Sequence, residues 1–210
     1  MTGVTKRFGS TIAIRNLTLK IDRGEEVALL GPNGSGKTTL LRLIAGQIQP
    51  TSGTAKVLEF DTVRDQEKVK RSVGLVSHRS FLYDELDIEE NLRFYGVFHN
   101  ADDERLEKAL DAANLQRYRH VTARHLSYGL RKRADIARSM LGDPEVLVLD
   151  ELFSGLDQEA CEMLVDHLKA RKGKTLLVSS HSIEWVRDLC NRVIVLNNGS
   201  IVKDGMLSST

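Results

Sequence analysis

One stretch of the chain has residue types and spacing suited to binding phosphate. It fits the P-loop pattern G-x-x-x-x-G-K-[ST] and reads Gly31, Pro32, Asn33, Gly34, Ser35, Gly36, Lys37, Thr38. The glycines let backbone N–H groups turn onto phosphate oxygens, and a following helix would add its positive N-terminal end. Lys37 is expected to reach the β- and γ-phosphates and Thr38 to ligate Mg²⁺, with Thr39 in the same site. The stretch therefore predicts a site for a nucleoside triphosphate and Mg²⁺.

The neighbours of this stretch favour a working P-loop over an accidental match. An apolar run typical of a strand, Val27–Leu30, precedes it, and a run typical of a helix, Thr39–Ala45, follows it. A P-loop needs this order, because the strand holds the loop and the helix points at the phosphates. The alternative, a glycine-rich turn that matches by chance, gives no reason for the order.

Two adjacent carboxylates follow a second apolar run. Asp150 and Glu151 come directly after Val146–Leu149, and ligands of open α/β sheets bind at the carboxyl ends of strands. Asp150 is predicted to hold Mg²⁺, directly or through water, since this ion prefers oxygen ligands. On a continuing strand Glu151 would lie on the opposite face of the pleat, where it would act on the attacking water. The alternative is a strand that ends in a solvated Asp-Glu turn.

Five further residues are candidates for the same edge of the sheet. Ser127 precedes a helical run and fits an N-cap, and a helix start with Ser127 and Gly129 also suits an anion. His181 and His78 each follow a run typical of a strand, so both are expected at the carboxyl-terminal edge of the sheet, near the phosphates. The alternative for each is a purely structural histidine. Phe8 belongs either to the core or to a surface that stacks on a base.

Composition and charge limit the class of protein. The chain has 210 residues, 41% of them apolar, and 30 basic against 29 acidic residues give a net charge of +1. This balance favours a globular protein and gives no indication of nucleic-acid binding. No run approaches the length of a membrane span, and we expect no signal peptide. Cys161 and Cys190 form no metal or redox motif, so we expect buried thiols.

The order of expected elements predicts one domain with an insertion. Strands are expected within residues 1–30, including Leu17–Ile21, and strand and helix patterns alternate from there to about residue 80 and again after 143. The first of these stretches includes a short strand expected at Thr54–Leu58 and a charged helix expected at Asp65–Arg71. Between about 81 and 142 the spacing is helical, in Ile88–Phe98, Asp102–Ala113 and Tyr128–Leu141. The predicted fold is an α/β P-loop NTPase with an N-terminal antiparallel β portion and an inserted all-helical subdomain. A single domain would cover 1–210, with its catalytic core in 1–80 and 143–210.

Taken together, these motifs resemble those of the ATP-binding subunit of ABC transporters, over nearly the whole chain. Gly31–Thr38 matches the Walker A motif, and Leu149–Glu151 matches Walker B with its catalytic glutamate. Leu126–Leu130 is similar to the family signature Leu-Ser-Gly-Gly-Gln, and Ser154–Asp157 matches the D-loop. The helical insertion also lies where the family has it, between Walker A and the signature.

The resemblance implies roles for single residues. His181 falls at the position of the family's switch histidine, and Phe8 at that of an aromatic residue that stacks on adenine. The implied nucleotide contacts outside Walker A are Phe8, Ser127, Gly129 and Asp157, and the implied catalytic residues are Glu151, His181 and His78.

The resemblance also implies partners and a location. Two copies would pack head to tail, with ATP between Walker A of one chain and the signature of the other, and hydrolysis would release them. This cycle would drive integral-membrane permease subunits, which would hold the chain in the cytoplasm against the inner face of the membrane. The permease is expected beside His78, on a surface with Phe81, Leu82, Tyr83 and Phe94. For these four apolar residues burial in a core is the alternative.

The chain departs from the family pattern at several positions. Tyr128 and Leu130 replace the usual Gly and Gln of the signature, while Ser127 and Gly129 remain. Leu152 replaces the Pro after the catalytic glutamate, which restores a backbone N–H without removing a catalytic group.

His78 stands where the family has glutamine. Histidine here, with Leu82–Leu86 and Glu90–Tyr95 after it, is similar to the haem-exporter ATPases of cytochrome c maturation. Imidazole has no oxygen, and Mg²⁺ prefers oxygen ligands, so His78 is expected to bind a metal-bound water or the attacking water.

Other functions of the same class of domain stay open. An ATPase that exports another solute, such as a drug or a lipid, fits all of these motifs. A soluble ABC ATPase acting on DNA or ribosomes fits less well, because there is no room for a long coiled coil and only one ATPase unit is present. A P-loop kinase would not need the signature or the D-loop.

Overall fold

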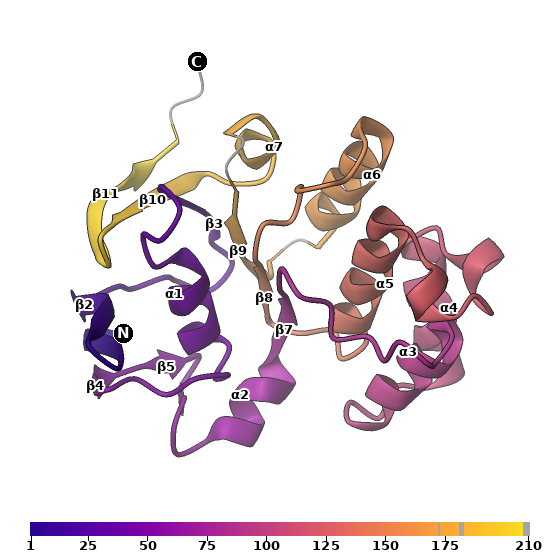
Figure 1. The fold of residues 1–210 in the computed structure, drawn as a ribbon, viewed down its shortest axis with the longest axis horizontal. Helices are drawn as coiled ribbons and strands as arrows, with labels where there is room; N and C mark the ends of the chain where they lie inside the picture. The colour runs from indigo at the N-terminus through magenta and orange to yellow at the C-terminus, as the bar shows by residue number, and fades with distance from the viewer. Residues whose placement is uncertain (172, 181–182, 208–210) are drawn as a thin grey trace.

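A six-stranded sheet forms the centre of the protein in the computed structural model, which describes residues 1–171, 173–180 and 183–207. The strand order is β11-β10-β3-β9-β8-β7, with β11 antiparallel and the other strands parallel to their neighbours. The strands are β3 (Glu26–Leu30), β7 (Val73–Val76), β8 (Val146–Leu149), β9 (Thr175–Ser179), β10 (Arg192–Asn197) and β11 (Ser200–Met206). Figure 1 shows this sheet through the middle of the molecule.

A smaller antiparallel portion precedes and follows the P-loop in the chain. β1 lies between β2 and β4, and β5 pairs with β6. The strands are β1 (Thr2–Phe8), β2 (Thr11–Leu17), β4 (Ser52–Thr54), β5 (Lys56–Val57) and β6 (Phe60–Asp61). The predicted fold class, with its N-terminal antiparallel portion, is confirmed.

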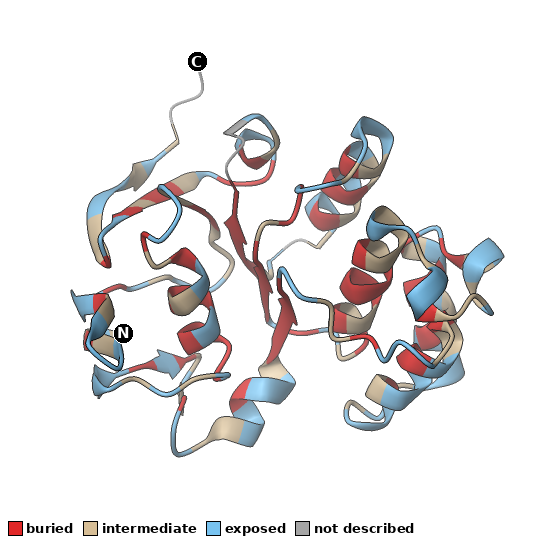
Figure 2. Ribbon diagram, viewed as in Figure 1, coloured by how far each residue is buried: buried red, intermediate tan, exposed pale blue. Residues whose placement is uncertain are grey.

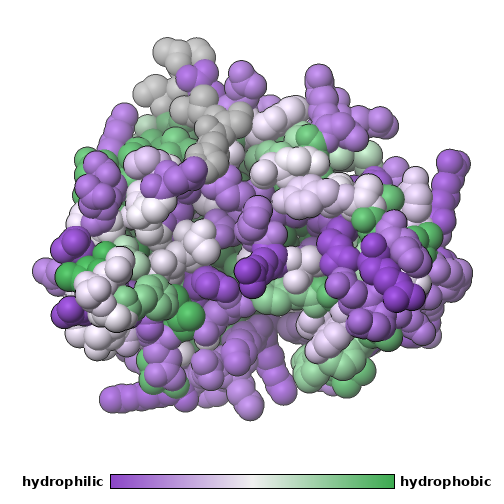
Figure 3. Space-filling model, viewed as in Figure 1, coloured by the Kyte–Doolittle hydropathy of each residue, from purple (hydrophilic) through white to green (hydrophobic). Residues whose placement is uncertain are grey.

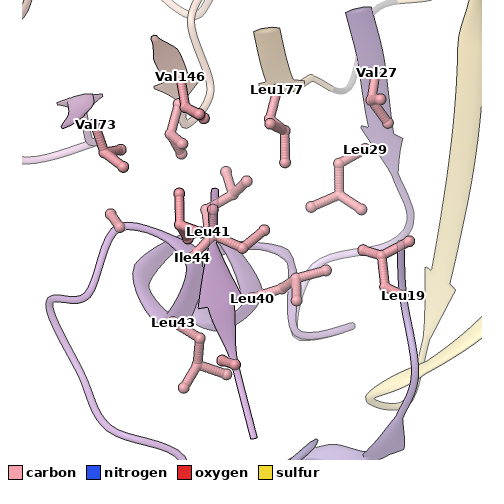
Figure 4. Close-up of a cluster of buried hydrophobic side chains, with 14 of the residues drawn as sticks. Leu19, Val27, Leu29, Leu40, Leu41, Leu43, Ile44, Val73, Val146 and Leu177 are labelled. Carbon is pink, nitrogen blue, oxygen red and sulfur yellow. The ribbon is translucent and has the colours of Figure 1, made fainter. Parts of the chain in front are cut away.

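Helices cover both faces of the sheet, because the buried strands are largely apolar and successive side chains point to opposite faces. Val27 and Leu29 of β3 join the cluster around α1 (Lys37–Ile44), whereas Ala28 between them joins the opposite cluster with α6 (Gln158–Lys169) and α7 (Ile183–Arg187). Figure 4 shows the leucines of α1 against the side chains of β3 and its neighbours. Figure 2 shows β7, β8 and β9 buried along their length.

The elements between β7 and β8 are helical. They are α3 (Ile88–Val97), α4 (Asp103–Ala112), two short 3-10 helices (Gln116–Tyr118 and Ala123–His125) and α5 (Tyr128–Met140). They enclose an apolar cluster of their own, which includes Ile88, Leu92 and Leu110. Ile136 of α5 packs instead with the sheet, so α5 belongs to both clusters. The boundaries near residues 80 and 143 remain a proposed division of the domain.

The predicted strands near the N-terminus are partly wrong. β2 ends at Leu17, although Leu19 is buried and its N–H donates to Met1 O at 3.0 Å. The strand expected over Thr54–Leu58 is split between β4 and β5, and Leu58 has φ +55°. Alternation marked which residues are buried, but pairing with a neighbour sets where each strand ends. The short helix α2 (Gln66–Ser72) lies where a charged helix was expected.

Candidate functional site

A cleft of about 580 Å³ opens at the carboxyl ends of β3, β7 and β8. Residues 33–39 of the loop and α1 line it together with Asp150 and Glu151, which follow β8. Ser77, His78 and Arg79, which follow β7, complete this part of the lining. The structure thus brings the P-loop, the carboxylates and His78 together from three separate parts of the sequence.

The loop before α1 turns so tightly that two positions have no room for a side chain. Gly31 has φ +146°, and a Cβ there would overlap the carbonyl oxygen of Leu196. Gly36 has φ +108°, and its Cβ would lie 2.7 Å from Ala13 O. Only glycine tolerates such backbone angles at such close approach. The loop is therefore fixed to β10 and β2 on either side.

The cleft has donors suited to phosphate oxygens. Lys37 is 6% exposed, and its Nζ donates to Gly31 O at 2.7 Å and Pro32 O at 3.2 Å. The Ser35 hydroxyl is buried and finds no hydrogen-bond partner among the described residues. A buried hydroxyl without a partner is costly, and an anion in the loop would satisfy it. These observations fit a phosphate group in the turn.

The two carboxylate residues after β8 are held by one serine. Asp150 is 2% exposed and accepts from Ser179 Oγ at 2.6 Å, while the N–H of Glu151 donates to the same oxygen at 2.9 Å. The expectation that Glu151 continues the pleat is wrong, because β8 ends at Leu149 and Glu151 has φ +52°. A left-handed residue turns the chain out of the strand, and Glu151 still reaches the cleft lining.

Of the other residues predicted for this cleft, His78 lines it and Phe8 does not. His78 is exposed and lines the cleft. Phe8 ends β1 with its side chain 50% exposed, so the core alternative is wrong; Lys6 Nζ lies 5.0 Å from its ring centroid. Phe8 is not among the described residues that line the cleft. His181 lies outside the described residues.

A second hollow, of about 730 Å³, contains the signature and the D-loop. Ser127 caps α5 by accepting a backbone N–H at 3.3 Å, and Asp157 caps α6 by accepting one at 2.8 Å. Gly129, Arg117 and Arg133 line the same hollow. Two helix N-termini and the two guanidinium groups provide donors for an anion, although the carboxylates of Asp157 and Glu159 also line the hollow.

The departures from the family signature have structural consequences. Tyr128 is 45% exposed and its ring lies against Gly155, where an added Cβ would be 2.5 Å from Tyr128 Cε1. The signature and the D-loop of one chain are thereby in direct contact. Leu152, which replaces the proline, is fully buried in the cluster with α6 and α7.

An exposed hydrophobic surface lies on the helical part, and we call it the α3 patch. It consists of Tyr83 (47% exposed), Phe94 (40%), Val97 (74%) and Phe98 (58%). Figure 3 shows hydrophobic surface over the end of α3. The prediction that Leu82 is also available here is wrong, since Leu82 is buried in the helical cluster, and Phe81 is partly buried.

Two residues at the cleft were missed in the sequence. Ser179 ends β9 beside β8, and only the strand pairing shows that it reaches Asp150. Lys132 of α5 is 5% exposed, and its Nζ donates to Ser77 O and Asp150 O at 3.4 Å each. Burial lowers the pKa of the Lys132 ammonium, which the nearby carboxylates oppose. In the sequence Lys132 is one of several basic residues on a helix, so nothing marked it.

None of the helices in the described part of the chain has both the length and the hydropathy that a membrane span requires.

Known proteins resemble this chain in sequence and in structure. The chain is 35% identical to the ABC transporter ATP-binding protein NatA of Bacillus subtilis, over 94% of this chain and 83% of that protein. It is 34% identical to the Nod factor export ATP-binding protein I of Cupriavidus metallidurans, over 98% of this chain and 70% of that protein.

Solved structures and a family model agree with these relatives. A dimeric post-hydrolysis state of the ATP-binding cassette MJ0796, bound to ADP and Pi, matches with a TM-score of 0.91 and 28% identity, over 100% of this chain and 98% of that chain. The ABC transporter family model matches residues 14–154. The chain therefore belongs to the ABC transporter family, as an ATP-binding subunit that hydrolyses ATP.

Proposed function

We propose that this chain powers a membrane transporter through a cycle in which two copies close on ATP and separate after hydrolysis. One observation carries the proposal. The P-loop cleft and the signature hollow of a single chain have no described lining residue in common. Each hollow has donors for an anion, so a second chain, placed head to tail, would complete both.

The proposed nucleotide position follows from the donors of the two hollows. The phosphates would lie in the turn of the P-loop, where Lys37 and the hydroxyl of Ser35 meet them. Ser127 and Gly129 of the second chain would then contact the γ-phosphate, beside Asp157 of its D-loop. Adenine would stack on Phe8, whose half-exposed ring lies on the antiparallel portion.

The residues after β8 and β7 would carry the chemistry. Thr38 and Asp150 line one cleft and have the oxygen ligands that Mg²⁺ prefers. When bound, Mg²⁺ would neutralise charge on the β- and γ-phosphates. Glu151 would accept a proton from the attacking water as a general base, and His78 would hold a water rather than the metal. His181 keeps its proposed role as the switch histidine.

The α3 patch is the proposed contact with the permease. Its four apolar side chains lie on the same helical part as the signature helix α5, so a partner bound there would move with the signature. Exposed apolar residues in one place are typical of protein interfaces. The chain would in this way be held in the cytoplasm, at the inner face of the membrane.

The transported solute is a separate question. The prediction of haem export rests on His78 and the residues that follow it. The relatives described above carry other names, NatA and Nod factor export protein I. We propose a transporter whose substrate is set by the permease, with haem as one candidate and another exported solute as the alternative.

Replacing Lys37 by alanine is expected to weaken ATP binding. Charge-assisted hydrogen bonds contribute about 1.5–3 kcal/mol each, so the loss corresponds to roughly 10- to 100-fold in affinity. Fluorescence titration with a labelled ATP analogue measures it. Lys203→Ala, an exposed lysine on β11, is the matched control and should bind as the wild type does. Equal affinities of Lys37→Ala and wild type would show that the phosphates lie elsewhere.

Replacing Glu151 by glutamine is expected to stop turnover and to trap a dimer in Mg-ATP. Glutamine accepts no proton from the water but keeps the size of the side chain. Light scattering should give a monomer without nucleotide and a dimer with it, and the double variant with Lys37→Ala should stay monomeric. Wild-type turnover in Glu151→Gln would remove Glu151 as the base.

Replacing Val97 by aspartate is expected to release the chain from membranes and to leave its own ATPase activity unchanged. Val97 is the most exposed residue of the α3 patch, so the fold should tolerate a charge there. Fractionation of the native cells measures the membrane-bound share. Val202→Asp, the same substitution at an exposed valine on β11, is the control. If both variants sediment with membranes as the wild type does, the α3 patch is not the docking surface.

A further inference from the structure

Side chains on one face of α5 form hydrogen bonds with the segment that follows β7. Three residues of the helix, spaced three apart, take part: Lys132, Asp135 and Arg138. This spacing puts their side chains on neighbouring positions of one helix face. Asp135 is 1% exposed and Lys132 5% exposed. Charged groups are rarely buried so deeply unless each has partners, so their bonds need an explanation.

The bonds from this face go to the backbone on both sides of His78. Arg138 donates to Leu75 O at 2.6 Å, and Lys132 donates to Ser77 O at 3.4 Å. Asp135 accepts the N–H of Phe81 at 3.2 Å. The segment 75–81 is therefore attached to the helix at its start, its middle and its end.

Asp135 is the centre of this arrangement. One of its oxygens accepts the Phe81 N–H, and the other accepts Arg138 Nε at 2.7 Å. The Arg138 guanidinium in turn lies 4.9 Å from the Phe81 ring centroid and 5.0 Å from that of Tyr95. Tyr95 also donates its hydroxyl proton to Phe81 O. Removing Asp135 would leave both Arg138 and the Phe81 N–H without the acceptor that joins them.

The same helix begins at the signature serine. Ser127 caps α5, and the helix then passes β7 so closely that a Cβ on Gly74 would overlap Ser139 O. Figure 1 shows α5 beside β8 and β7, between the sheet and the helices α3 and α4. A shift of Ser127 along this helix would thus be carried to the segment that holds His78 in the cleft.

We propose that Asp135 is a positioning residue for ATP hydrolysis, which fixes His78 to the signature helix by holding Phe81 and Arg138. The inference rests on the proposed function in one respect, since it takes His78 to face the nucleotide. Asp135 itself touches no nucleotide; it acts through residues 75–81. It should affect turnover more than binding, because the P-loop and Lys37 belong to another part of the fold.

Hydrogen exchange tests the attachment without any need for turnover. In Asp135→Ala the amides of residues 75–81 should exchange about tenfold faster, the factor that ~1.4 kcal/mol corresponds to, while β9 exchanges as before. Asp135→Asn keeps an oxygen for the Phe81 N–H and most of the size, so a smaller increase of about threefold is expected. Asp103→Asn, which breaks an exposed ion pair with Arg93 on the same helical part, should change nothing here.

Steady-state kinetics test the role in the reaction. In Asp135→Ala we expect kcat to fall about tenfold and the Kd for a labelled ATP analogue to stay within about twofold, with Asp135→Asn between it and the wild type. If the alanine variant does not fold, the asparagine variant alone decides.

The inference is overturned if Asp135→Asn has wild-type exchange at 75–81 and wild-type kcat. It is also overturned if the variants lose thermal stability and ATP affinity in the same proportion as kcat, with no local change in exchange. A wild-type chain without Mg-dependent ATPase activity would instead contradict the proposed function, and the exchange experiment would still decide the role of Asp135.

Discussion

The turn between β3 and α1 is the constraint on which the rest of the structure depends. It approaches β10 at Gly31 and β2 at Gly36 so closely that neither position has room for a side chain. The turn can be held this way only if β3 lies in the interior of the sheet with α1 packed beneath it, as the strand order and the α1 cluster show. The central sheet thus supports the turn and Lys37, at the place where we propose that the phosphates bind.

The other residues at the carboxyl-terminal edge of the sheet are held by contacts between several strands and α5. Ser179 of β9 orients both Asp150 and Glu151, and Lys132 ties the ends of β7 and β8 to α5. A carboxylate buried as deeply as Asp150 is stable as an anion only with such donors or a cation near it. The same requirement makes the site sensitive to the position of α5, which also carries the signature.

Much of this arrangement could be predicted from the sequence, because the informative residues are local. The P-loop, the run before Asp150 and the N-cap Ser127 are each defined by neighbours in the chain. The ends of β2 and β4 were mispredicted because they depend on pairing, and the turn at Glu151 because an apolar run does not show where the pleat stops. Ser179 and Asp135 act across the fold, so no local pattern marked them.

The helical part has its own core and is joined to the sheet through α5, which its sequence showed only in part. Its own apolar cluster makes it a unit, while Ile136 and the polar face of α5 attach it to the sheet beside the cleft. The α3 patch, which we propose binds the permease, and the signature are therefore on elements that share one core. A force applied at the patch would be transmitted through that core to the phosphate edge.

Chemical cross-linking between two singly labelled chains tests most directly whether the signature of one chain completes the cleft of another. One chain would carry Asn33→Cys and the other Tyr128→Cys, both with Glu151→Gln; the native Cys161 and Cys190 are buried and should not react. Mixed and treated with a short bismaleimide, the two chains should form a covalent pair only with Mg-ATP. A pair that forms equally well without nucleotide, or none at all at high protein and Mg-ATP concentration, would contradict the account.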